Sequence, residues 1–316
     1  MKMLFGAVLA AACAQPLSAC DICAVYAAHE ARGEIGKGFF AGAAEQFTHF
    51  GTLQEDGRRV PNEASQFLDS SITQILAGYN FNDHIGVQFN APLIHRSFRR
   101  AEGEMVERGS ESGLGDVSLM IHLQPYRREK RDSTLALNLL GGVKFPTGST
   151  DRLKEELNES EPAEGEAESG VHGHDLTLGS GSWDGIVGAS VFARWKRVFF
   201  VAAMQYAIRT EGDFDYQFAN DLLWSGGPGV MLALSDNFTL SLQVNVSGET
   251  KDKDEFEGAK ADDTGITSVY VGPEILLTWS GKLSVEAGVD VPVMIDNTAL
   301  QIVPDWRVRG AVTWHF

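Results

Sequence analysis

The sequence has 316 residues, of which 43 are acidic and 26 basic, so the formal net charge is −17. A chain this acidic does not bind nucleic acid or anionic lipid through a general basic surface. No stretch beyond the N-terminal leader approaches the roughly 20 consecutive apolar residues that a membrane-spanning helix requires, which excludes a helical membrane protein.

The N-terminus has the composition of a secretory signal peptide. Lys2 precedes an apolar run that ends at Ala14, and small residues follow, as in the charged, apolar and cleavage regions of an export signal. We expect residues 1–19 to be cleaved, which leaves 43 acidic and 25 basic side chains and a net charge of −18. A periplasmic segment at 20–36 then precedes one domain at 37–316, because no linker divides the remaining pattern.

Apolar residues recur at every second position along most of this domain. In segment 238–247, phenylalanine, leucine and valine alternate with threonine, serine, glutamine and asparagine. Segment 283–293 repeats the alternation, and its charged residues share one side. A period of two is typical of a strand with one apolar face, whereas the helical period is nowhere sustained.

Turn residues between these runs divide the domain into twelve candidate strands. We expect them near 37–50, 67–80, 84–98, 113–125, 133–147, 184–196, 198–210, 220–234, 237–249, 265–279, 282–295 and 303–316. Short connections alternate with longer ones, the longest at 148–183. Outer-membrane barrels have this asymmetry, with short periplasmic turns and long extracellular loops, and an even strand count places both ends of the barrel on the periplasmic side.

A soluble β-sandwich also alternates apolar and polar residues, so the choice of fold needs further observations. The expected strands, of about 13 to 16 residues, exceed the ~5–6 typical of soluble sheets and suffice for a tilted membrane crossing. All six tryptophans lie at expected strand ends, and at ~3.3 Å per residue and a tilt of ~40° Trp183 and Trp195 would be about 30 Å apart along the axis. The sequence therefore predicts an all-β fold, a closed antiparallel transmembrane β-barrel in the outer membrane.

The chain ends in an alternating strand with a terminal Phe316. This ending resembles the C-terminal signature of bacterial outer-membrane proteins. The resemblance implies that the barrel-assembly machinery is a partner through the last strand, in addition to outer-membrane lipid.

If the aliphatic side of each strand contacts lipid, the other side lines the lumen. The candidate lining is polar and carries both signs of charge: Gln88, Asn90, Asp116, His122, Lys144, Arg194, Gln243, Asn245, Glu274, Glu286, Asp290, Arg307 and Arg309. These side chains would set the selectivity of an open pore, or would form ion pairs that fill a narrow barrel. The acidic residues among the last five come from strands close to the one that carries the arginines, so some of these charges are expected to pair.

The connection 148–183 is strongly acidic and contains His172 and His174. Carboxylates and imidazoles could hold a divalent cation such as copper or zinc, which is the only cofactor that the sequence indicates. We favour the alternative of a solvated, mobile acidic loop, because a His-x-His pair without a fixed third ligand is weak evidence for a metal site.

Cys20 and Cys23 have the spacing of a redox or metal-binding pair, and in an oxidising compartment they would form a disulfide. The residues before Cys20 also resemble a lipobox, which would acylate Cys20 and leave Cys23 alone. Covalent haem attachment is disfavoured because Ala24 follows the pair in place of histidine. We favour the intact pair, since a barrel needs no lipid anchor.

His95 and Ser97 lie two apart on the expected lipid-facing side of the third strand. Outer-membrane phospholipase A is similar in having twelve strands and an exterior His-x-Ser pair, so a lipid esterase is one alternative. We find no Asn or Asp at the matching height on the strand 67–80 to orient the histidine, and we therefore expect no enzyme.

Two short motifs stand out along the chain. One is Lys144-Phe145-Pro146-Thr147-Gly148-Ser149, a long loop, and then a Gly- and Ser-rich segment that leads through Trp183 to Asp184; the other is the turn Gly113-Leu114-Gly115-Asp116. Both resemble the outer-membrane family named for the MetA pathway of phenol degradation. The resemblance implies a barrel transporter for aromatic or other hydrophobic compounds. We expect an outer-membrane channel or transporter, a porin for small solutes, with a metal-linked binding protein that uses the acidic loop and the cysteine pair as the alternative.

Overall fold

Long strands make up most of the computed structural model, which describes residues 36–103, 105–158 and 168–316. The strands of the wall are β1 (Gly38–Glu55), β3 (Phe67–Asn80), β4 (Ile85–Glu102), β5 (Met105–Leu114), β6 (Ser118–Lys130), β7 (Ser133–Lys144), β8 (Asp184–Trp195), β9 (Val198–Ile208), β11 (Asp221–Leu234), β12 (Phe238–Lys251), β15 (Ile266–Trp279), β16 (Leu283–Asn297) and β17 (Leu300–His315). The connections contain β2 (Arg58–Arg59), η2 (Asp151–Asn158), α1 (Gly173–Leu176), η3 (Asp213–Asp215), β10 (Tyr216–Gln217), β13 (Glu255–Phe256), β14 (Ala259–Lys260) and η4 (Asp262–Thr264). The expected signal peptide, Cys20 and Cys23 lie outside the described residues.

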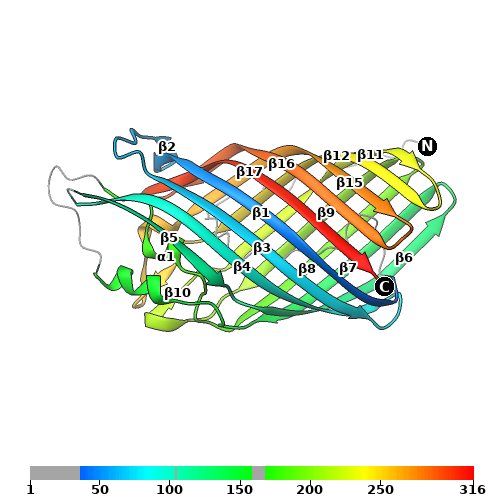
Figure 1. The fold of residues 1–316 in the computed structure, drawn as a ribbon, viewed down its shortest axis with the longest axis horizontal. Helices are drawn as coiled ribbons and strands as arrows, with labels where there is room; N and C mark the ends of the chain where they lie inside the picture. Colours follow the sequence, from blue (N-terminus) through cyan, green and yellow to red (C-terminus); the bar gives the residue numbers. More distant parts are fainter. Residues whose placement is uncertain (1–35, 104, 159–167) are drawn as a thin grey trace, which may run out of the picture.

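The strands form one sheet that closes on itself (Figure 1). Fourteen strands of the described chain belong to it; β2 only extends β1, and β5 and β6 share one position, which leaves twelve positions. The closing pair is β1 with β17, which runs from Phe40 opposite His315 to Glu55 opposite Leu300 with shifts of register between His49 and Thr52. The predicted closed twelve-strand antiparallel barrel is confirmed.

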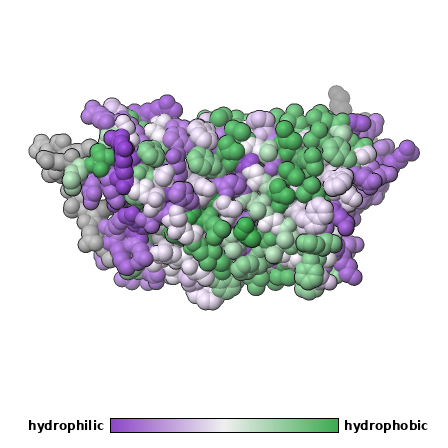
Figure 2. Space-filling view, viewed as in Figure 1, coloured by the Kyte–Doolittle hydropathy of each residue, from purple (hydrophilic) through white to green (hydrophobic). Residues whose placement is uncertain are grey.

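Apolar side chains lie on the outside of this barrel and polar ones inside. On β12, Leu242 and Val244 are 40% and 51% exposed, whereas Gln243 and Asn245 are 4% and 2% exposed. This is the reverse of a soluble sandwich, in which the apolar face is buried. The surface is hydrophobic over the middle of the barrel and hydrophilic towards the left-hand end (Figure 2). Alternation in the sequence therefore reflects lipid outside and a polar lumen inside.

Tryptophans mark both rims of the apolar surface. Trp183 and Trp306 are exposed near the ends that carry the long connections, and Trp195, Trp279 and Trp314 are exposed near the short turns. Aromatic girdles of this kind occupy the two membrane interfaces of outer-membrane barrels. Because the long loops of such barrels are extracellular, the end with the long connections is the extracellular one. The protein lies in the outer membrane.

The structure departs from the expected strand bounds where the chain leaves the membrane. Residues 99–112, expected to be a loop, continue β4 and form β5, which pairs with it from Leu93 opposite Leu114 to Glu102 opposite Met105. This hairpin extends beyond the apolar band, so neither side needs to be aliphatic and the alternation that identifies the other strands is missing.

The wall strand formed by β5 and β6 is interrupted at residues 115–117. The amide of Gly115 donates a hydrogen bond to the carbonyl of Pro92 at 2.8 Å. A Cβ at Gly115 would lie 2.7 Å from Cδ1 of Ile94 and 3.2 Å from the carbonyl oxygen of Leu178, so a larger residue would require its neighbours to shift. The interruption lets the next residue, Asp116, turn into the lumen, where its side chain is 1% exposed.

Candidate functional site

The connection after β7 returns into the extracellular half of the lumen; we call residues 168–183 the plug. Val171 and Leu176 are both fully buried and pack against inward-facing side chains of β1, β3, β4 and β17. Backbone bonds also hold the plug, since the amide of Ile302 donates to the carbonyl of Gly170 at 2.7 Å. The expectation of a solvated, mobile loop is wrong for this part of the connection, because the lumen supplies an apolar surface that the loop sequence alone does not reveal. Residues 159–167, which hold much of its acidic charge, lie outside the described residues.

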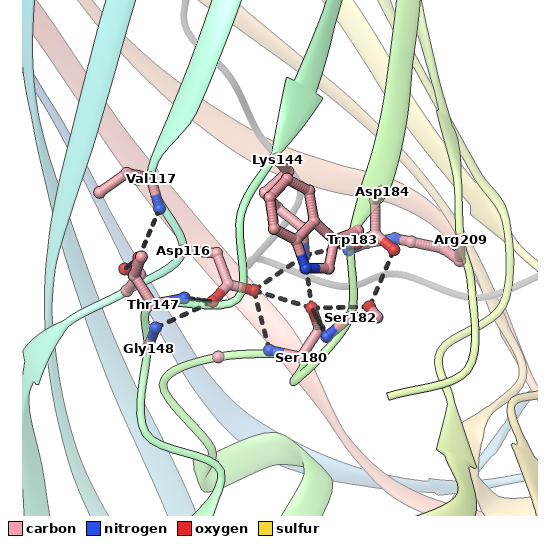
Figure 3. Close-up of polar contacts among 12 residues, drawn as sticks. Asp116, Val117, Lys144, Thr147, Gly148, Ser180, Ser182, Trp183, Asp184 and Arg209 are labelled. Carbon is pink, nitrogen blue, oxygen red and sulfur yellow. Dashed lines mark hydrogen bonds and ion pairs between the residues drawn. The ribbon is translucent and has the colours of Figure 1, made fainter. Parts of the chain in front are cut away.

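Asp116 joins the two ends of the connection at the base of the plug (Figure 3). Its Oδ1 accepts hydrogen bonds from the amides of Thr147 and Gly148 at 3.1 and 3.0 Å. Its Oδ2 accepts from the amide and the hydroxyl of Ser180, both at 2.8 Å. One carboxylate therefore fixes the start and the end of a loop of more than thirty residues.

Two cations complete this arrangement, which we call the clasp (Asp116, Lys144, Ser180, Asp184 and Arg209). Lys144 Nζ lies 3.0 Å from Asp116 Oδ2 and 2.7 Å from Asp184 Oδ2, and Arg209 Nη1 lies 2.6 Å from the same Asp184 oxygen. These four side chains are at most 4% exposed. Two carboxylates thus face two cations in a buried site, so the formal charges of the clasp balance.

Sequence analysis identified Asp116 and Lys144 as lumen residues but missed Asp184, Arg209 and Ser180. Asp184 and Arg209 lie at the ends of expected strands and share their parity with the inward-facing Arg194 and Gln205, so strand parity could have found them. Ser180 carries no such signal, because it lies in a loop whose path depends on the lumen around it.

A cavity of about 230 Å³ lies in the lumen, away from the clasp. Along β9 the inward-facing residues proceed from Phe199 at the periplasmic end, through Val201 and Gln205 at the cavity, to Arg209 in the clasp. The lining of the cavity includes the predicted lumen residues Gln243, Asn245, Glu274, Glu286, Arg307 and Arg309. It also includes apolar side chains, among them Ile72, Leu140, Leu223 and Leu276.

Five charged residues form one cluster on this wall, which we call the belt (Glu274, Glu286, Asp290, Arg307 and Arg309). Arg309 contacts Asp290 at 2.7 Å, Glu274 at 3.1 Å and Glu286 at 3.5 Å. Arg307 contacts Asp290 at 3.2 Å and Ser247 Oγ at 2.7 Å. The expected pairing of these charges is present. Three carboxylates and two guanidinium groups leave an excess of one negative charge, and Arg309 and Glu286 stay 19% and 14% exposed towards the cavity.

An apolar layer lines one side of the lumen on the periplasmic side of the cavity. It consists of Ala136, Phe192, Phe199, Met231 and Leu276. Phe192 and Phe199 stack with their ring centroids 5.9 Å apart. A solute that moves along the axis on this side of the lumen therefore meets the plug, the polar and charged cavity, and this layer in turn.

The other predicted lumen residues also lie on inward-facing positions. Gln88 donates to Asn90, and His122 is buried on β6. Arg194 binds Thr134 Oγ1 and the carbonyl of Lys196 near the periplasmic mouth. These residues line the wall without joining the clasp or the belt.

His172 and His174 lie in the plug and are 9% and 7% exposed. Their rings stack at 5.4 Å; His172 Nδ1 lies 3.4 Å from Asp263 Oδ2, and His174 Nε2 lies 3.5 Å from Asp175 Oδ1. Burial disfavours the charged form of Asp263, yet the two imidazoles lower its pKa below the ordinary value. Among the described residues no group of three or more His, Cys, Asp or Glu side chains has an arrangement that could hold a metal ion. The metal site therefore stays a prediction.

On the outside of the barrel, the structure corrects the expectation about His95 and Ser97. Asp69 on β3 lies directly opposite Ser97, so an acidic residue does stand at the matching height. However, Asp69 Oδ1 is bound by His49 Nδ1 at 2.6 Å, and His95 Nδ1 lies 2.6 Å from Ser112 Oγ. The acid and the His-x-Ser pair thus have separate partners and do not form one catalytic relay.

None of the helices in the described part of the chain is long and apolar enough to span a membrane. Comparison with solved structures identifies the COG4313 outer membrane channel from Pseudomonas putida F1, which superposes with a TM-score of 0.60 at 15% sequence identity, over 89% of this chain and 97% of that one. The fold is that of an outer-membrane β-barrel.

Two other solved barrels superpose with lower scores. The β domain of the Bordetella autotransporter BrkA gives a TM-score of 0.44 at 10% identity, over 88% of this chain and 99% of that one. A Pseudomonas aeruginosa FadL homologue gives 0.35 at 9% identity, over 89% and 91%. No family model and no curated protein matches the sequence. The resemblance to the phenol-degradation family therefore stays a prediction.

Proposed function

We propose that the barrel is a channel that carries small solutes across the outer membrane by way of the cavity in its lumen. The solutes that fit are compounds of single-ring size with an apolar body and a polar substituent. The observation that carries this proposal is the cavity itself, which has a volume of about 230 Å³ and both an apolar and a charged lining.

The size of the cavity agrees with such a solute. An apolar cavity of ~150 Å³ inside a protein holds benzene, so 230 Å³ admits a ring with one or two substituents. Leu223 and Leu276 offer contact to an apolar body. Glu286 and Arg309, which stay partly exposed, offer an acceptor and a donor to hydroxyl or carboxyl substituents.

The relatives point in the same direction. The solved barrel from Pseudomonas putida that shares the fold is described as an outer membrane channel, and the motifs around Lys144 and Gly113 resemble a family of transporters for aromatic compounds. A binding cavity between a plug and an apolar layer favours the passage of solutes that bind there briefly. It disfavours the free flow of water and ions.

A pair of substitutions on β11 tests the proposal. Leu223 lines the cavity, whereas its neighbour Leu222 has the opposite parity and faces outward. Leu223→Trp should fill the cavity and reduce the uptake of phenol-sized compounds into proteoliposomes to near the rate of empty vesicles. Leu222→Trp adds the same side chain to the lipid-facing surface and should leave uptake unchanged.

Conductance of the purified full chain in planar bilayers provides the second measurement. We expect small, infrequent current steps that are blocked by millimolar concentrations of the transported compound. If Leu223→Trp and the unchanged protein transport phenol-sized compounds equally well, the cavity is not on the solute path and the proposal fails.

A further inference from the structure

The hairpin of β4 and β5 presents different chemistry on its two faces. On the inner face, Arg100 binds Glu107 at 2.6 Å and Glu155 at 2.7 Å. Arg152 reaches the same face from η2 and binds Glu111 at 2.5 Å. These ion pairs join the hairpin to the loop behind it and hold the two strands in a fixed position above the membrane.

On the outer face, Arg99 and Arg108 lie directly opposite each other in the β4–β5 register. Within the described chain, neither makes an ion pair or a side-chain hydrogen bond, and Arg99 Nε is buried without an acceptor. Like charges opposite each other on adjacent strands destabilise the pair. Two arginines at such a position therefore indicate an external anion.

The residues below the arginines follow a regular chemical order along the outer face. Leu93 faces Leu114, His95 faces Ser112, Ser97 faces Ser110 and Arg99 faces Arg108. Leu93 and Leu114 are exposed apolar residues, and the six steps from Leu93 to Arg99 rise by about 15 Å at ~3.3 Å per residue and a tilt of ~40°. The order from the membrane outward is thus apolar, hydroxyl and imidazole, then cationic.

We propose that this face binds a phosphate group of lipopolysaccharide, the glycolipid of the outer leaflet, between Arg99 and Arg108. The order of groups along the hairpin matches acyl chains, sugar hydroxyls and phosphates in the glycolipid. Guanidinium groups bind phosphate oxygens in a bidentate manner. The nearest acidic side chain on the outer face of β3 is Asp69, whose carboxylate is already bound by His49. The site is independent of solute transport through the lumen.

Binding of deep-rough lipopolysaccharide to the full-length protein in detergent tests this inference. Removal of both arginines in the double variant Arg99→Ala/Arg108→Ala should weaken binding by at least about tenfold, because the phosphate then loses its charged hydrogen bonds. Arg99→Lys/Arg108→Lys should restore part of the affinity, since it keeps the charge and loses the bidentate geometry. Heat-modifiable electrophoretic mobility verifies that each variant is folded.

The matched control removes the same charge elsewhere on the extracellular side. Arg58 and Arg59 are exposed on β2, and Arg58→Ala/Arg59→Ala should leave the affinity unchanged. Lipopolysaccharide treated with phosphatase should bind the unchanged protein as weakly as untreated glycolipid binds the double alanine variant. Equal loss in the β2 variant would mean general attraction of anions and would overturn the inference. So would full competition by millimolar inorganic phosphate, which would assign the arginines to free phosphate.

Discussion

The clasp and the belt are both clusters of acids and bases inside the same barrel, but they differ in exposure and in what they contact. The clasp side chains are at most 4% exposed and bind the backbone of the connection that forms the plug. In the belt, only Asp290 is fully buried, and Arg309 and Glu286 reach the cavity. The clasp charges therefore position the loop, whereas the belt charges border the cavity that we propose as the solute path.

The difference follows from the balance of charge and from what surrounds each cluster. In the clasp, two acids and two bases are enclosed by protein, and their formal charges balance. The belt has one more acid than bases and borders an open volume. Variants that disturb the clasp should change stability and the plug, while variants of the belt should change selectivity in a barrel that stays intact.

The largest effect is expected when the clasp loses a cation. Lys144→Met leaves Asp116 and Asp184 without their shared base, and removing one partner of a buried ion pair costs about 3–5 kcal/mol. Urea unfolding of the barrel in lipid vesicles, followed by tryptophan fluorescence, measures the loss. Lys130→Met, at an exposed position near the periplasmic turn, is the control. Equal stability of the two variants would contradict a structural role for the clasp.

A milder change to the clasp should release the plug and keep the barrel. Asp116→Asn preserves the shape but lacks the charge and one acceptor, so we expect a loss of about 2 kcal/mol. The plug should then leave the lumen part of the time and raise the single-channel conductance. Protease cleavage within 168–183 in intact vesicles offers an independent measurement. Protection of this segment at the level of the unchanged protein would show that Asp116 does not hold the plug.

In the belt, Glu286→Gln should alter ion preference and little else. Arg309 keeps Asp290 and Glu274 as partners, so stability should change by less than about 0.5 kcal/mol. Loss of one negative charge beside the cavity should reduce the permeability of cations relative to anions by about threefold. Reversal potentials in a salt gradient report this ratio. A large loss of stability would show that Glu286 has a structural role, as the clasp residues do, and would contradict this prediction.

The smallest effect concerns pH. The lowered pKa of Asp263 means that its contact with the plug histidines is complete above the ordinary aspartate pKa of ~3.9 and is lost only as the pH falls through the lower folded value. Current fluctuations of single channels should therefore be the same at pH 7 and pH 5 and increase only as the pH falls below the ordinary aspartate pKa. Asp263→Asn should fluctuate at neutral pH and show no further change. An increase already at pH 5 would disprove this assignment.

Most strands of the wall could be predicted from sequence because each of their residues faces either lipid or the lumen. Lipid outside and a polar lumen inside impose a period of two, and the strand predicted at 67–80 has the bounds of β3, Phe67–Asn80. Prediction was wrong at residues 99–112, where β5 stands above the membrane and no apolar side is required. The two-residue period of apolar side chains indicates contact with lipid, whereas the β structure continues beyond the part of the barrel that contacts lipid.

The parts of the site differ in the same way. Strand parity predicts that Lys144 and Arg309 face inward, but it does not distinguish a buried clasp from a belt that borders a cavity. That distinction depends on pairs such as Asp116 with Ser180, which are 64 residues apart in sequence and meet only when the connection folds into the lumen. The plug is buried by strands from both ends of the chain, so its own composition, which is rich in polar residues, wrongly indicates solvent exposure.

The seam between β1 and β17 has a consequence for how the molecule is made. The first strand of the barrel bonds along its length to the last, from Phe40 with His315 to Glu55 with Leu300. Until the last strand is in place, the first strand therefore has a free edge, and an unpaired edge can bind wrong partners. The barrel can therefore close only after the last strand is available, whatever strands have already paired.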